Sequence, residues 1–127
     1  MKTNRSVLMC AIIAGYLLAF QPAKAQDPAK VASQAFTVKV DNAHTRVLAY
    51  HSKPGDKEAM HSHPACVLYV VNGGKIKSTT PDGKSKITEY KAGDVVWRDA
   101  ITHSGENVGT TEVSSILVEF KEVAKKK

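Results

Sequence analysis

Between residues 35 and 122 apolar and polar residues alternate, and this alternation restricts the possible folds more than any other feature of the chain. Phe36, Val38 and Val40 are separated by single polar residues, a two-residue period that places alternate side chains on opposite faces of a β-strand. Turn signals such as residues 53–56 (KPGD) and 81–84 (PDGK) interrupt the pattern at intervals of roughly 8–12 residues. The sequence therefore predicts about eight short strands in an all-β sandwich or barrel.

Residues 1–25 have the organisation of a secretory signal peptide. Lys2 and Arg5 precede an almost wholly apolar run at residues 7–20, and Ala23-Lys24-Ala25 matches a cleavage site with two small residues. We therefore expect cleavage after Ala25 and export to the periplasm or out of the cell. The alternative is an uncleaved membrane anchor, but the apolar run is shorter than the about 20 residues that span a bilayer. After cleavage we expect no membrane span.

The remainder of the chain has the length of one domain. Residues 26–34, which are small and polar with one proline, are interpreted as a linker or loosely held N-terminal arm. Residues 35–122 are interpreted as the domain and residues 123–127 as a basic tail. Three of the 18 basic residues precede residue 26, which leaves 15 against 12 acidic residues. This excess equals the three lysines of the tail, so the charge of the domain predicts no binding to nucleic acid.

Residues 60–74 carry the clearest chemical signal. His61 and His63 are two residues apart, so on an extended backbone both imidazoles point to the same side. Cys66 follows as the only cysteine after residue 25, and a β-branched and aromatic run then ends at Gly73-Gly74, which suits a tight turn. This stretch predicts a metal site on a buried strand, with a thiol that has no partner for an internal disulfide.

Two segments resemble the conserved motifs of the cupin superfamily. The first comprises Gly55, His61-Ser62-His63 and the run from Tyr69 to Gly73, and the second comprises Gly93-Asp94, residues 99–103 and Asn107. The resemblance spans roughly Val38 to Lys121 and implies a jelly-roll barrel, also called a double-stranded β-helix, with a divalent transition metal inside. It further implies that the metal ligands are His61, His63 and His103, and that Asn107 holds loop backbone in place.

The chain departs from the family pattern at the usual glutamate ligand, where alignment backwards from Tyr69 places Cys66. Cys66 is either a fourth ligand or a small buried residue beside a three-histidine site, and the frequent burial of free cysteine favours the second interpretation. A thiolate would favour Zn or Cu(I), whereas three histidines alone keep Fe, Mn and Ni open as well. Glu58 is a weaker candidate for a fourth ligand, and His51 matches no motif.

Several other residues are candidates to line the interior cavity of such a barrel: Met60, Tyr69, Trp97 and Arg98. Because Trp97 shares a strand face with Val95, we expect it to pack in the core instead of stacking on a substrate.

The residues support two functions. The first is an exported metalloenzyme, such as a dioxygenase or isomerase, that acts on a small molecule at open coordination positions of the metal. The second is a non-catalytic module that binds a metal or a small ligand. The fold does not choose between them, because such barrels host many unrelated activities. The predicted edge strand near residues 36–40 also suggests pairing of two copies as a homodimer.

Overall fold

The alternating sequence forms nine strands within residues 26–122, the part of the chain that the computed structural model describes. The strands are β1 (Phe36–Asp41), β2 (Thr45–Ser52), β3 (Lys57–His63), β4 (Cys66–Asn72), β5 (Gly74–Thr79), β6 (Ser85–Tyr90), β7 (Val95–Arg98), β8 (Ile101–Asn107) and β9 (Val113–Phe120). The all-β prediction is confirmed. The predicted signal peptide and basic tail lie outside the described residues.

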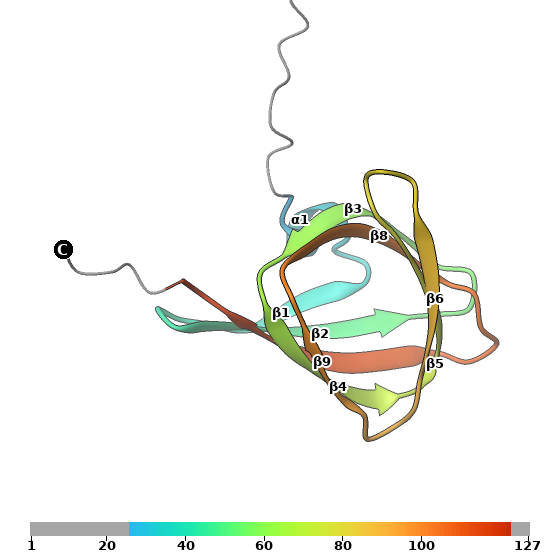
Figure 1. The fold of residues 1–127 in the computed structure, drawn as a ribbon. Helices are drawn as coiled ribbons and strands as arrows, with labels where there is room; N and C mark the ends of the chain where they lie inside the picture. The colour runs from blue at the N-terminus through green and yellow to red at the C-terminus, as the bar shows by residue number, and fades with distance from the viewer. Residues whose placement is uncertain (1–25, 123–127) are drawn as a thin grey trace, which may run out of the picture.

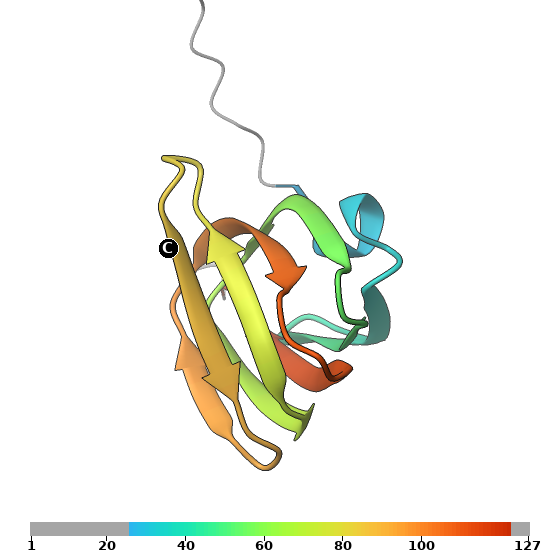
Figure 2. The same ribbon diagram turned by 90° about the vertical axis from the view of Figure 1, so that its right-hand side faces the viewer.

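The strands pair into two antiparallel sheets that face each other and close into a barrel (Figures 1 and 2). The first sheet has the order β1-β2-β9-β4-β7, and the second has the order β3-β8-β5-β6. We call them sheet A and sheet B. This arrangement confirms the predicted jelly roll.

The stretch from residue 60 to residue 74, expected to form one strand before a turn, instead belongs to three. It contains the end of β3, all of β4 and the start of β5. The break after His63 falls at Pro64, which lacks the N–H that a central strand needs. The chain crosses there from sheet B to sheet A, so His63 and Cys66 lie on different sheets.

The core lies between the sheets and consists mainly of inward-facing residues of sheet A. Leu48 of β2, Leu117 of β9 and Leu68 of β4 are aligned across neighbouring strands and are almost fully buried. Each such side chain contributes roughly 1.5–3 kcal/mol through burial. This apolar row supports one wall of the barrel and leaves sheet B to carry most of the buried polar residues.

Residues 26–34, expected to be a linker or loose arm, contain a packed helical turn, α1 (Pro28–Val31). Asp27 caps it by accepting a hydrogen bond from Ala29 N at 3.0 Å, and its carboxylate pairs with Arg46 at 2.9 Å. Pro28 and Ala32 are buried, and α1 packs against β3. A single turn is too short to produce a helical period in the sequence, which explains why the expectation was wrong.

Asn107 holds the loops at one end of the barrel together, as the family resemblance implied. Its buried Nδ2 donates to Ser52 O at 3.0 Å and to Thr111 O at 2.9 Å, and its Oδ1 accepts a hydrogen bond from Gly109 N at 3.0 Å. These three bonds connect the ends of β2 and β8 to the loop before β9, so this residue has a structural role.

Candidate metal centre

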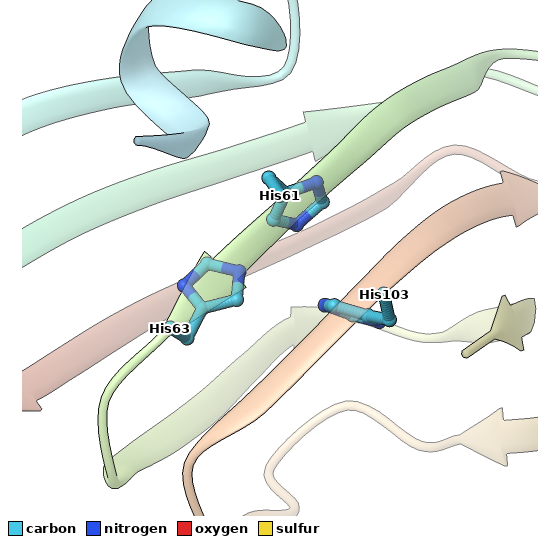
Figure 3. Close-up of side chains that lie close together, drawn as sticks. All are labelled: His61, His63 and His103. Atoms are coloured by element: carbon cyan, nitrogen blue, oxygen red, sulfur yellow. The ribbon is translucent and has the colours of Figure 1, made fainter. Parts of the chain in front are cut away.

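Three histidines meet inside the barrel from two neighbouring strands of sheet B (Figure 3). His61 of β3 and His103 of β8 are directly paired across the sheet, and His63 follows His61 on the same face of β3. One ring nitrogen from each lies within 4.8 Å of the others, and all three residues are buried. The sequence analysis named this set, and the pairing of β3 with β8 brings its distant member into place.

Each ring is oriented through its Nδ1 atom. His61 Nδ1 lies 2.7 Å from Ala59 O, and His63 Nδ1 lies 2.6 Å from Glu119 Oε1. Because these oxygens only accept hydrogen bonds, both Nδ1 atoms carry the proton. His103 Nδ1 lies 2.7 Å from the hydroxyl of Ser78, which can accept the same bond. The arrangement leaves the Nε2 lone pairs free.

The three Nε2 atoms are buried and have no hydrogen-bond partner among the described residues. Buried polar atoms in folded proteins normally have a partner, so three such atoms facing one another need an explanation. A divalent transition metal provides one, because neutral imidazole nitrogens are good ligands for Zn, Cu, Fe and Ni. The residues present therefore fit the cofactor that the sequence predicted.

The environment keeps the rings of His61 and His103 neutral. Burial lowers the pKa of His61 to about 4, and burial together with the nearby His61 lowers the pKa of His103 to about 3. Phe36 contributes to this burial, since its ring centroid lies 5.1 Å from that of His61 and 5.3 Å from that of His63. Neutral imidazoles at pH 7 are the form that binds a metal.

Glu119 is the functional residue that the sequence analysis missed. It lies on β9 of sheet A, is 2 % exposed, and accepts the hydrogen bond from His63 across the barrel. A carboxylate in this position fixes the ring and increases the basicity of Nε2, the nitrogen that would bind a metal. The sequence did contain one indication of this position. Glu119 is an even number of residues from Val113, Ser115 and Leu117, which share the inward face of β9.

Neither candidate fourth ligand belongs to the group of ligand atoms found in the described residues. Cys66 is fully buried in the apolar core cluster, and burial raises the pKa of its thiol, which favours the packing interpretation. Glu58 is also buried, and its Oε1 accepts a hydrogen bond from Tyr50 OH at 2.6 Å. Burial raises the pKa of this carboxyl group, while the hydrogen bond from Tyr50 lowers it in part.

A cavity of about 40 Å³ adjoins the histidine cluster. Its polar lining comes from His103, Glu58, Tyr50, Ser115 and Arg98, so the prediction for Arg98 is confirmed. The expected core position of Trp97 is wrong.

Trp97 lies on the outside of the barrel with 59 % of its surface exposed. Its indole N–H donates to Asp99 Oδ1 at 2.9 Å, and its ring stacks on Phe120. Inward positions of β7 belong instead to Val96 and Arg98. Tyr69 is likewise on the outside and 49 % exposed. His51, which matched no motif, lies at the surface and pairs with Glu112.

The fold matches solved cupin structures. A cupin domain from Bordetella pertussis is 26 % identical, with a TM-score of 0.62 over 68 % of this chain and 92 % of that one. The domain has the cupin fold. A double-stranded β-helix protein from Klebsiella pneumoniae (22 % identical; 69 % and 84 % covered) and an RmlC-like cupin from Methanocaldococcus jannaschii (17 %; 67 % and 79 %) each give a TM-score of 0.52. No family model matches the sequence, and the comparison with curated proteins gives no match.

Among residues 26–122, the group of candidate ligands offers three imidazole nitrogens and no carboxylate. Three protein ligands leave further coordination positions for water or a small molecule. A metal in that position would supply Lewis acidity or oxygen activation, while the protein orients the rings and limits access of water through Phe36 and the core.

Proposed function

We propose that this cupin binds a divalent transition metal through Nε2 of His61, His63 and His103, and acts on a small molecule at that centre. The observation that carries the proposal is the set of three buried Nε2 atoms that have no partner within residues 26–122, each with its Nδ1 atom already engaged. The hydrogen bonds at Nδ1 prepare the rings for a ligand on the opposite nitrogen.

The small molecule would bind beside His103, where polar groups converge on the cavity. A dioxygenase or an isomerase is the enzyme class that we propose, since both use open metal positions for a small substrate. The alternative is a non-catalytic metal-binding module. The small size of the cavity, about 40 Å³, favours this alternative, because such a volume holds only a few water molecules or a small functional group.

Metal analysis of the purified domain tests the proposal. We expect about one metal ion per chain after loading with Fe, Mn, Ni, Cu or Zn, and loss of most of it in His61→Ala and His103→Ala. His51→Ala is the matched control, because this histidine is exposed on the surface. Absence of stoichiometric metal under every loading condition would contradict the proposal. Oxygen consumption and isomerisation assays on loaded protein then separate an enzyme from a binding module.

We also propose that the protein is exported after cleavage at Ala25, on the basis of the sequence of residues 1–25. No helix in residues 26–122 is long and apolar enough to cross a membrane. Intact-mass measurement of protein recovered from a bacterial periplasm tests this, since cleavage after Ala25 leaves a mass that corresponds to residues 26–127.

A further inference from the structure

Arg98 stands between the interior cavity and a larger open pocket. It lines the cavity of about 40 Å³ together with His103 and Glu58. It also lines an open pocket of about 530 Å³ at β5, β6 and β7, together with Tyr90. Its Nη2 donates to Tyr90 OH at 3.0 Å, which holds the guanidinium group in place. A molecule that enters from the open pocket toward the histidines therefore meets this cation.

The guanidinium group of Arg98 has no carboxylate within ion-pair distance among the described residues, 26–122. Arg46 provides the comparison, because it is also half-buried and pairs with Asp27 at 2.9 Å. Arginine at a partly buried site usually forms such a pair, because its planar fork matches the two oxygens of a carboxylate. The fork of Arg98 is therefore available to pair with an anionic group of a small molecule.

The charges inside the barrel also favour an anionic ligand. Imidazole ligands carry no negative charge, so a bound divalent ion would keep its full charge, and Arg98 adds another positive charge nearby. The carboxyl groups of Glu119 and Glu58, which accept hydrogen bonds from His63 and Tyr50, supply at most two negative charges. A ligand with a negative charge would balance the excess of positive charge in this low-dielectric interior.

We propose that Arg98, with the hydroxyl group of Tyr90, forms an anion subsite that binds the carboxylate of a small organic acid. The cavity admits only a small group, so the body of the acid lies in the open pocket. The phenol of Tyr90 accepts from Arg98 and retains a proton to donate to the carboxylate. A small organic acid would then be the substrate class of the proposed function. This inference rests on the proposed function only for the part of the acid that would react at the metal.

Calorimetric titration with acetate, succinate and benzoate, each compared with its neutral amide, tests the subsite in zinc-loaded and metal-free protein. We expect the acids to bind at least about tenfold more tightly than the amides, and Arg98→Gln to weaken acid binding about 10- to 100-fold without changing amide binding. Arg98→Lys keeps the charge without the fork and should give an intermediate loss. Lys86→Gln is the matched control, because it removes one charge from the open pocket only.

Unchanged acid affinity in Arg98→Gln, an equal loss in Lys86→Gln, or no binding of any of the three acids would overturn the subsite. Zinc content and thermal melting of each variant are measured in parallel, so misfolding is recognised separately. Failure of the proposed metal function appears as missing zinc. The titration of metal-free protein then still tests Arg98 by itself.

The outer face of sheet A is unusually apolar. Two rows of residues are aligned across its strands and point away from the core. The first row contains Val40, Val47, Val118, Val67 and Trp97, and the second contains Thr37, Ala49, Ile116, Tyr69 and Val95. Nine of these ten residues are apolar, and Phe120 adds to the patch by stacking on Trp97. A solvated sheet face normally carries polar residues instead.

The outer face of sheet B shows the normal pattern and serves as an internal comparison. Lys75 is paired with Glu89, and Lys77 is paired with Glu106, so charged residues cover this face. Ile87 is an isolated apolar residue there and is 59 % exposed. The apolar outer face is therefore a property of sheet A alone.

The exposed area on sheet A matches the requirement of a homodimer. Trp97, Tyr69 and Phe120 are 59 %, 49 % and 41 % exposed, which corresponds to roughly 300 Å² of aromatic surface. Val40 and Val95, which are 45 % and 70 % exposed, bring the patch to roughly 500 Å². A standard interface buries about 800 Å² on each partner, of which about 65 % is apolar in homodimers. The patch thus provides the apolar part of one such interface.

We infer that a second copy of this chain packs on the outer face of sheet A in a two-fold dimer. The two rows contain no charged residue, so the same patch can face itself without like-charge repulsion. Face-to-face packing of two twisted sheets is a standard solution for such surfaces.

Analytical ultracentrifugation of residues 26–127 at about 5–100 µM tests the dimer. We expect a mass near two chains for the wild type, and mostly one chain for Tyr69→Lys and Val95→Glu, since each places a charge in the interface. Ile87→Glu adds a charge to an equally exposed position on sheet B and should remain dimeric. A monomeric wild type would overturn the inference. Dimers that persist in both sheet A variants would also overturn it, and would point to pairing at the β1 edge.

Discussion

Replacing Glu119 by leucine removes the hydrogen-bond acceptor that orients the His63 ring. The carboxylate oxygen lies 2.6 Å from His63 Nδ1, and the two side chains are 3 % and 0 % exposed, so no water can substitute for it without rearrangement. The loss of such a partner typically weakens metal binding 10- to 100-fold, which is roughly 1.4–2.7 kcal/mol. Glu119→Gln retains an oxygen acceptor while removing the charge, so we expect a smaller loss, nearer the lower limit.

Zinc affinity is measured by competition with a chromophoric chelator at pH 7.5. Glu112→Gln provides the matched control, because Glu112 also pairs with a histidine, His51, but both side chains are about half exposed. We expect this control to change the affinity by less than about twofold. Urea unfolding of the metal-free variants reports separately on the unpaired Nδ1–H of His63, which should cost roughly 1–3 kcal/mol.

Two results would refute this reasoning about Glu119. The first is an unchanged zinc affinity in Glu119→Leu, which would mean that His63 does not need its partner or is not a ligand. The second is an equal loss in Glu112→Gln, which would show that removal of any acidic residue weakens the binding of a cation. Retained affinity in Glu119→Gln together with a loss in Glu119→Leu would assign the effect to ring orientation.

Three further predictions concern acid stability, the loop anchor and the thiol. Metal-free protein should lose stability as the pH falls from about 6.5 to 4, because the unfolded chain protonates His61 and His103 there while the folded chain does so only near pH 4 and 3. The slope in urea unfolding should approach roughly 2–3 kcal/mol per pH unit and become shallower in His103→Gln, and a flat profile would contradict it. Asn107→Ala should destabilise the fold by roughly 2–4 kcal/mol through three lost hydrogen bonds, and more than Asn42→Ala, whose side chain binds backbone at the surface. Cys66→Ala should keep the zinc stoichiometry of the wild type, whereas loss of zinc would assign the thiolate to the metal.

Local patterns predicted much of the centre because the covalent geometry of a strand determines where nearby residues point. His61 and His63 share a face on any extended backbone, and the position of His103 followed from the family resemblance. Trp97 shows the limit of this reasoning. The two-residue period correctly groups it with Val95, but the period does not say which of the two faces of β7 is buried.

The sequence by itself determined the all-β class, most of the turns and the choice of the three histidines, because these depend on alternation and on residues that are close together or match a known motif. Only the tertiary structure decided which carboxylate forms a hydrogen bond with a histidine of the site. Glu119 lies 56 residues from His63 and meets it only because β9 and β3 face each other across the barrel. The structure likewise placed Cys66 in the core, one of the two positions that the sequence left open, and turned an apolar face of sheet A to the outside. These outcomes depend on how two sheets pack, and such contacts are absent from the local pattern of any single strand.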